Sequence, residues 1–365
     1  MEKAKISVIQ LFAMMVIFDM GTALVISYGL TARKDAWIAI LLSMGGGVIL
    51  FTIYYFLFRQ YPSLPLTSYI QKIFGKHLGM VIGYIYILYF LNIAARNIRD
   101  INDLLASSTL RETPSIAIIT PLVLAICYVL YLGIEVLART SEVCIVILIL
   151  FGAAGNFFIL ISGNLEFHNL LPILEQGWKP ICTTIPKIIP LPFGEMIVFT
   201  MLLPFLNKIK YVKKVWLSAM ILSGIILSWT VSLNIIILGV DVTEQATFPT
   251  LTTVGKINLL DFVQRLDAII VFTLLITVFF KVSIFIYAAV MGITDLFNLS
   301  SHHRILFPIG VVVIYISLTM AANFQEHLKE GQEMLYIMHL PLLLIIPILM
   351  AIISFIQTRF MKKGN

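Results

Sequence analysis

Long apolar runs recur along the whole chain, and they constrain its fold more than any other feature. Each run holds about 20 residues, the length of helix that crosses the hydrocarbon core of a bilayer. Hydrophobic residues make up 60% of the sequence and charged residues only 12%. A water-soluble chain of 365 residues has no core large enough to cover that much apolar surface. The sequence therefore predicts an all-α polytopic membrane protein.

The apolar runs predict ten transmembrane helices in a single integral membrane domain over residues 1–365. The predicted spans are residues 6–29, 36–58, 78–105, 114–133, 141–163, 187–206, 213–240, 259–291, 304–322 and 335–358. An even number of spans places both termini on one side of the membrane. Lys and Arg are about twice as frequent in the loops on that side as in the opposite loops, which predicts cytoplasmic N- and C-termini.

The two longest connections suggest an internal repeat. Residues 59–77 link the second and third spans, and residues 241–258 link the seventh and eighth. The two links lie five spans apart and on opposite sides of the membrane. This spacing predicts an inverted repeat of five plus five helices, with residues 1–163 as the first copy and 187–358 as the second. A coincidence of loop length is the alternative.

The first and sixth spans both carry signals for a broken helix. The first contains "VIFDMGTALVIS" and the sixth "IIPLPFGEMIVF", so small residues interrupt one span and two prolines interrupt the other. Proline removes a backbone donor, and glycine lets the chain unwind. Unwound backbone at membrane depth occurs beside a cavity or buried in protein. Close packing of small residues and ordinary proline kinks are the alternative explanation.

Paired interruptions in the two repeats predict a binding site near the membrane midplane. Free amides at a half-helix N-terminus can hold a carboxylate, and free carbonyls attract an ammonium group. Such a site suits a small zwitterion such as an amino acid. The candidate ligand-binding residues are Gly21, Thr22, Ala23, Arg96, Phe193, Gly194 and Glu195.

Charged residues inside the spans form two further candidate groups, because ionisable side chains in a membrane usually face a partner or water. Arg96 and Asp100 on the third span, with Arg265 and Asp267 on the eighth, lie in the external third. They form either an outer gate or a set of satisfied interfacial charges with snorkelling arginines.

The second group lies deeper in the membrane. Asp19 lies at the interruption of the first span and Lys281 in the inner half of the eighth. We predict that these two residues form an ion pair at the junction of the two helices. In transporters built this way a sodium ion often occupies that junction, and here the fixed ammonium would replace it.

No pattern in the sequence indicates an enzyme, a cofactor or a metal site. The chain has no phosphate-binding loop, metalloprotease motif or nucleophile–base pair, and its histidines are expected at solvated loop positions. The net charge of +6 is not clustered in a soluble domain, so nucleic acid is not an expected partner.

Several short segments resemble one known family over essentially the whole chain. These are "PFGEMIVFTMLLPF" in the sixth span, "TFPTL" ending at Leu251, "QRLD" at residues 264–267 and the basic end "FIQTRFMKK". They are similar to the B subunit of nutrient germinant receptors from endospore-forming bacteria, a branch of the amino acid–polyamine–organocation transporter superfamily. The first span departs from the family pattern, because Ala23 stands at the second glycine of a Gly-x-Gly turn and no Pro-Arg follows.

The resemblance implies a LeuT-like fold and a receptor subunit in the spore inner membrane. Such a subunit would bind a germinant in a transporter-like pocket and act with an A subunit and a lipoprotein C subunit. A proton- or sodium-coupled amino-acid transporter is the alternative, because both functions need the same pocket.

Overall fold

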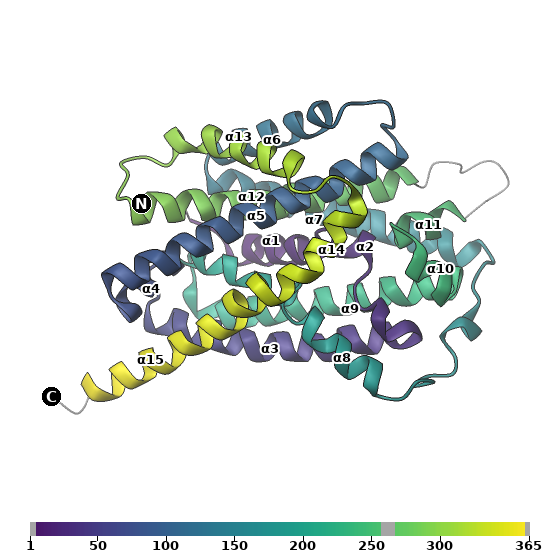
Figure 1. The fold of residues 1–365 in the computed structure, drawn as a ribbon, viewed down its shortest axis with the longest axis horizontal. Coiled ribbons are helices and arrows are strands. Elements are labelled where there is room, and N and C mark those ends of the chain that lie inside the picture. The colour runs from purple at the N-terminus through teal and green to yellow at the C-terminus, as the bar shows by residue number, and fades with distance from the viewer. Residues whose placement is uncertain (1–4, 257–266, 362–365) are drawn as a thin grey trace.

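The computed structural model describes residues 5–256 and 267–361, and every regular element in these ranges is a helix (Figure 1). Eight helical segments are long and apolar enough to cross a membrane. They are Val8–Ile26, Leu30–Gln60, Lys76–Ser108, Ile134–Ile161, Lys179–Met201, Ile209–Leu238, Asp267–Leu296 and Phe324–Arg359. Two shorter apolar helices, Ser115–Tyr131 and His303–Thr319, lie where the fourth and ninth spans are predicted. The multi-pass membrane architecture is therefore confirmed.

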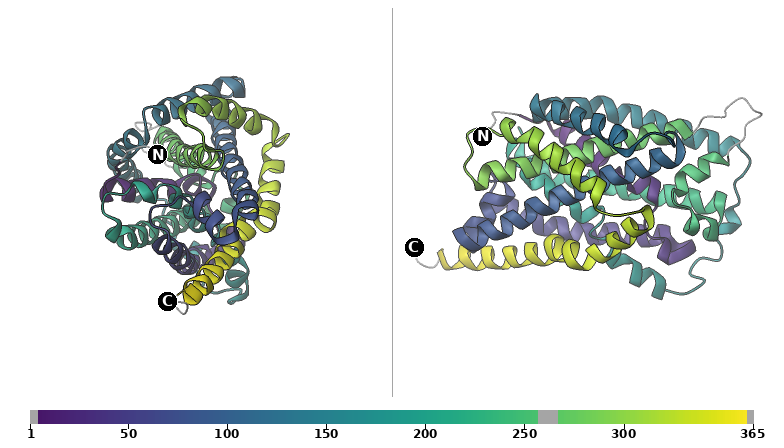
Figure 2. Two further views of the ribbon diagram at one scale, coloured as in Figure 1. Left: turned by 90° about the vertical axis from the view of Figure 1, so that its left-hand side faces the viewer. Right: turned by 45° about the horizontal axis from the view of Figure 1, so that its top comes forward.

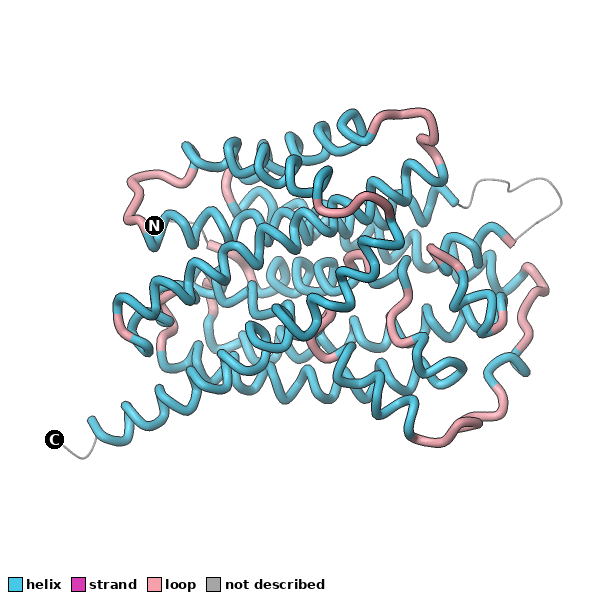
Figure 3. The backbone as a smooth tube through the Cα atoms, in the orientation of Figure 1, coloured by secondary structure: helices cyan, strands magenta, loops and turns pink. Residues whose placement is uncertain are grey.

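The individual elements follow one another with short connections, and Figure 3 shows helix throughout the bundle. In chain order they are α1 (Val8–Met20), α2 (Ala23–Ile26), η1 (Leu30–Asp35), α3 (Ala36–Gln60), α4 (Leu66–Phe74), α5 (Lys76–Ser108), α6 (Ser115–Tyr131), α7 (Ile134–Ile161), η2 (Phe167–Leu170), α8 (Lys179–Ile188), η3 (Phe193–Met201), η4 (Leu203–Phe205), η5 (Ile209–Tyr211), α9 (Val212–Leu238), α10 (Val240–Gln245), α11 (Pro249–Gly255), α12 (Asp267–Leu296), α13 (His303–Thr319), α14 (Phe324–Met334), η6 (Leu335–His339), η7 (Pro341–Ile345) and α15 (Ile346–Met361).

The long helices pack in pairs around the broken first helix. Helix α3 packs along α9, α5 along α12, and α6 along α13. The partners in each pair occupy the predicted second and seventh, third and eighth, and fourth and ninth spans. Helix α1 lies against α7, α9 and α12, and most of its side chains are buried. The two chain ends lie at the same end of the bundle, as an even number of spans requires (Figure 2).

The last span begins earlier than the hydropathy pattern predicts. The prediction starts at residue 335, whereas the continuous helical segment starts at Phe324. Its first part, α14, has the polar sequence "FQEHLKEGQEM" and is capped by Asn323, whose side chain accepts from the backbone N–H of Glu326. Averaged hydropathy leaves such a polar segment out of a predicted span. The Asn323 cap and the helix-favouring residues of α14 nevertheless stabilise a helix there.

Candidate functional site

The first span breaks at Gly21, as predicted. Helix α1 ends at Met20, and α2 begins at Ala23. Gly21 has φ +34°, a backbone conformation that residues with a Cβ atom rarely adopt. Its carbonyl oxygen accepts a hydrogen bond of 3.0 Å from the Thr277 hydroxyl of α12. The break therefore leaves a main-chain carbonyl outside the helical ladder, and the eighth predicted span supplies its partner.

The sixth span also breaks where prolines were expected to interrupt it. Helix α8 ends at Ile188, and the 3₁₀ helix η3 begins at Phe193. The Gly194 backbone N–H donates to the Ile189 carbonyl oxygen at 2.9 Å, which bridges the interruption. The Gly194 carbonyl accepts from the hydroxyl of Tyr54 on α3 at 3.3 Å. Both breaks are thus buried in protein, and each is tied to a neighbouring helix.

Lys281 of α12 connects the two breaks. Its Nζ lies 2.6 Å from Oε2 of Glu195, and both side chains are at most 3% exposed. The lysine chain passes directly over the first break, because a Cβ atom on Gly21 would lie 2.6 Å from Lys281 Cδ. The ammonium also lies 5.1 Å from the centre of the Phe18 ring, a cation–π distance. A fixed cation therefore occupies the junction between the first and eighth spans.

The predicted ion pair between Asp19 and Lys281 must be corrected. The carboxylate in contact with Lys281 is that of Glu195, which comes from the second broken helix. Asp19 is fully buried nearby, with Ser223 of α9, Lys281 and Glu195 as its polar neighbours. Neither of its carboxylate oxygens has a hydrogen-bond partner in the part of the chain that the structure describes. Two acidic side chains therefore face one lysine, and only one of them contacts it.

Six of the seven candidate ligand-binding residues lie at the two breaks, and all six are buried. They are Gly21, Thr22, Ala23, Phe193, Gly194 and Glu195. The seventh, Arg96, lies elsewhere on α5, where it contacts α14. The structure therefore places Arg96 with the outer charged residues.

The outer charges of α5 contact α14 at the start of the last span. Asp100 Oδ1 lies 2.8 Å from Nε2 of His327, a histidine that is 2% exposed. Arg96 lies 3.8 Å from a carboxylate oxygen of Glu330 and donates to the carbonyl of His327 at 2.5 Å. We call these four residues the outer clamp. A polar interaction of these α5 residues with another helix was predicted, and the partners that the structure describes lie on α14.

Of the two predicted partners on the eighth span, the structure describes only Asp267, and Asp267 is not part of the outer clamp. Arg265 lies outside the described residues. Asp267 begins α12, and neither Arg96 nor Asp100 pairs with it. A signal for the true partners was present in the sequence. His327 and Glu330 are three residues apart on a polar helical turn, so they share one helix face, as Arg96 and Asp100 do at four residues.

Two histidines expected in solvent are buried. His327 belongs to the outer clamp, and Nδ1 of His339 lies 2.8 Å from the Tyr89 hydroxyl of α5. His339 ends the π-helical segment η6, and the adjacent π-helical segment η7 supplies two further carbonyl acceptors. Leu342 accepts from the Tyr86 hydroxyl and Leu343 from that of Tyr54, both at 2.5 Å. Because Tyr54 shares its one hydroxyl proton between the Leu343 carbonyl and the more distant Gly194 carbonyl, it links the second break to the irregular middle of the last span.

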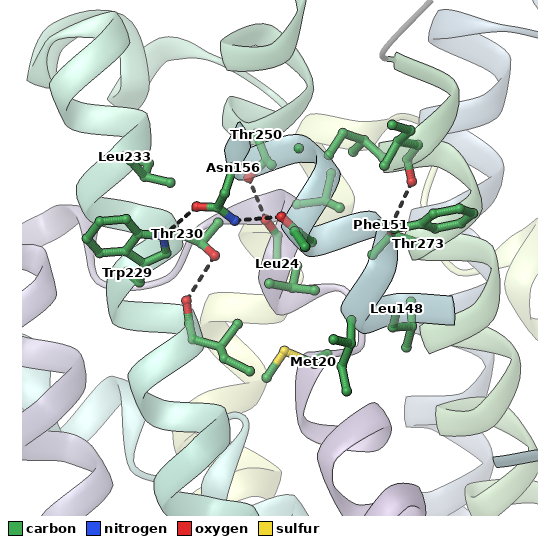
Figure 4. Close-up of a pocket in the computed structure, with 18 of the residues that line it drawn as sticks. Met20, Leu24, Leu148, Phe151, Asn156, Trp229, Thr230, Leu233, Thr250 and Thr273 are labelled. Carbon is green, nitrogen blue, oxygen red and sulfur yellow. Dashed lines mark hydrogen bonds between the residues drawn. The ribbon is translucent and has the colours of Figure 1, made fainter. Parts of the chain in front are cut away.

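A cavity of about 400 Å³ lies beside the first break, outside the predicted site (Figure 4). Met20 and Leu24 line it from the first span, and the remaining walls come from α7, α9, α11 and α12. None of the seven candidate ligand-binding residues lines this cavity. Within residues 5–256 and 267–361, no group of three His, Cys, Asp or Glu side chains is placed to hold a metal ion.

Comparison with known proteins identifies the family. A family model described as "Spore germination protein" matches residues 5–325. The chain belongs to the spore germination protein family. It is 40% identical over 368 residues to spore germination protein KB of Bacillus subtilis (strain 168), a match that covers 100% of this chain and 98% of that protein. It is 27% identical over 296 residues to spore germination protein A2 of the same organism, covering 78% of this chain and 77% of that protein.

Solved structures show that this spore germination protein has the fold of LeuT-type membrane transporters. Mhp1, a nucleobase-cation-symport-1 family transporter with bromovinylhydantoin bound, matches with a TM-score of 0.69 and 13% identity, covering 91% of this chain and 75% of that chain. MhsT in complex with L-phenylalanine matches with a TM-score of 0.67 and 11% identity, covering 97% and 89%. The predicted all-helical, LeuT-like membrane fold is confirmed.

Proposed function

We propose that this spore germination protein is the B subunit of a nutrient germinant receptor that binds a small amino acid between its two broken helices. The observation that carries the proposal is the meeting of both breaks at the buried contact between Lys281 and Glu195, on a chain of this family. Homology to germination protein KB supports the role in germination, and the transporter fold supports a small-molecule ligand.

The chemistry of the breaks suits a zwitterion. A helix end leaves backbone N–H and C=O groups without intrahelical partners, and these groups can hold a carboxylate and an ammonium group. The Glu195 carboxylate, which lies at the second break, could also bind the ammonium group of the ligand. Lys281 supplies the positive charge that holds Glu195 and the first break together, so a mobile sodium ion is not needed there.

The expected cellular role follows from the family. The subunit lies in the spore inner membrane with both termini in the cytoplasm, and it acts with an A subunit and a lipoprotein C subunit. Ligand binding shifts the subunit between two conformations by the difference in its affinity for them. The links from the second break through Tyr54 to the last span give one route by which that shift reaches the surface of the subunit.

A graded substitution at Gly194 tests the position of the site. A Cβ atom there would make ordinary contacts of 3.4 Å, so Gly194→Ala should bind normally, whereas Gly194→Leu should fill the site. Ala23→Leu should act like Gly194→Leu. We would measure binding of the 20 standard labelled amino acids to the purified protein and the germination of spores carrying each variant. Gly45→Leu is the matched control, because a Cβ atom at Gly45 meets no atom within 4 Å.

Normal binding and germination in both leucine variants would place the site elsewhere. Absence of binding by every amino acid in the unaltered protein would overturn the ligand class. In either case the protein must still reach the membrane, which immunoblotting of membrane fractions measures.

A coupled amino-acid transporter is the second candidate function, and the transporter fold favours it. The two functions differ in whether the ligand crosses the membrane. Proteoliposomes that contain only this chain separate them, with a labelled amino acid that binds to the purified protein. Binding without accumulation is expected for the receptor, and saturable uptake that responds to a pH or sodium gradient would overturn the receptor-only function.

A further inference from the structure

Small residues of α7 contribute to the open space of the cavity beside the first break. Gly152, Ala153 and Gly155 are among the α7 residues that line it, and a Cβ atom on either glycine would meet no other atom within 4 Å. Protein interiors are otherwise close-packed, with few voids larger than a water molecule. A void of about 400 Å³ along a membrane-spanning helix is therefore an unfilled groove, which we call the α7 groove.

The polar atoms along the α7 groove already have partners. Trp229 Nε1 donates to Oδ1 of Asn156 at 2.7 Å, as Figure 4 shows. The hydroxyls of Thr230, Thr250 and Thr273 donate to the carbonyl oxygens of Ile226, Leu24 and Ile269. A zwitterionic guest would lose its hydration without gaining a partner, which costs free energy. The groove is therefore suited to an apolar guest.

The groove is continuous with the lipid-facing surface. Only 6% of the most apolar stretch of α7 is buried, the lowest share among the long apolar segments described. Ile149 and Leu150 of this helix are 63% and 62% exposed, and Ile149 also lines the groove. At membrane depth such side chains face the hydrocarbon chains of lipids. A partner helix about 10–12 Å across is too thick for a cavity of this size.

We infer that the α7 groove binds one acyl chain of a membrane phospholipid. The chain enters from the bilayer beside α7 and lies against Met20 and Leu24, one on each side of the first break. It fills a void whose lining atoms would otherwise lack van der Waals partners on that side. Because the acyl chain touches both α1 and α2, it stabilises the present angle between these two halves of the first span. This inference is independent of the identity of the germinant.

A photoreactive lipid tests the inference. The full-length protein is reconstituted in phosphatidylcholine that carries a diazirine at the end of one acyl chain, then illuminated, and its adducts are mapped by mass spectrometry. Met20 and Leu24 lie behind α7, so only a chain inside the groove reaches them, whereas Ile149 contacts bulk lipid. We expect adducts at all three residues in the unaltered protein.

Filling the groove should remove only the inner adducts. The double variant Gly152→Leu and Gly155→Leu should reduce labelling at Met20 and Leu24 several-fold and leave Ile149 labelled. The milder pair of alanine substitutions should give an intermediate reduction, and Gly45→Leu should change nothing. Labelling at Ile149 reports correct membrane insertion for each variant.

Two results would overturn the inference. One is an unaltered protein labelled at Ile149 but not at Met20 or Leu24. The other is inner labelling that a free amino acid abolishes in competition, since the groove would then belong to the amino acid.

Discussion

Removing the Lys281 ammonium should destabilise the protein strongly. Its contact with Glu195 is 2.6 Å, and both side chains are at most 3% exposed, so Lys281→Met leaves a buried carboxylate without its cation. Breaking a buried pair by removing one partner typically costs about 3–5 kcal/mol.

A double-mutant cycle measures the coupling directly. We expect the double variant Lys281→Met with Glu195→Gln to recover a large part of the loss, since no unpaired charge remains at that contact. The free energy of unfolding is obtained from reversible denaturation in mixed micelles. A parallel cycle that combines Lys281→Met with Asp19→Asn should give a smaller interaction energy, because Asp19 does not contact the lysine. The exposed pair of Arg139 and Glu135, 3.9 Å apart, is the control and should couple by about 1 kcal/mol or less.

Without a direct contact, Lys281 and Glu195 would contribute independently to the free energy of unfolding. An interaction energy near zero in that cycle would refute the buried contact. A larger energy in the Asp19 cycle would restore the partner that the sequence alone suggested.

Three further substitutions test other parts of the site. Gly21→Ala should lower the free energy of unfolding by roughly 1–3 kcal/mol, because alanine strains a positive φ and displaces the Lys281 side chain above it. The control Gly45→Ala lies in an open helical position and should stay within about 1 kcal/mol of the unaltered protein. His327→Ala should lower the free energy of unfolding by about 1–3 kcal/mol and alter the germinant concentration for half-maximal response, because Asp100 loses its partner in the outer clamp. The control His168→Ala, at an exposed histidine, should change neither quantity. Tyr54→Phe should lower the free energy of unfolding by about 0.5–1.5 kcal/mol and slow germination, because it removes the hydroxyl that links the second break to the last span. Unchanged germination kinetics would exclude this link as a signalling route.

Features that depend on single residues and their chain neighbours could be predicted from the sequence. Hydropathy determined the apolar helices, because a bilayer requires each crossing segment to satisfy its own backbone hydrogen bonds. The small residues around Gly21 and the prolines before Phe193 determined both helix breaks, since backbone freedom and a missing donor are local properties. The family resemblance, carried by short segments along the chain, is confirmed by the match over residues 5–325.

Contacts between side chains of different helices could not be predicted in this way, because they depend on how the helices pack. A step of one residue turns a side chain by about 100° around a helix, so spacing along the chain cannot tell whether Asp19 or Glu195 faces Lys281. The same uncertainty hid the burial of His327 and His339, whose partners lie more than 200 residues away on α5. The α7 groove also has no sequence signature of its own. Glycines on one helix leave a void only where the neighbouring helices do not fill it, and that depends on how all of them pack together.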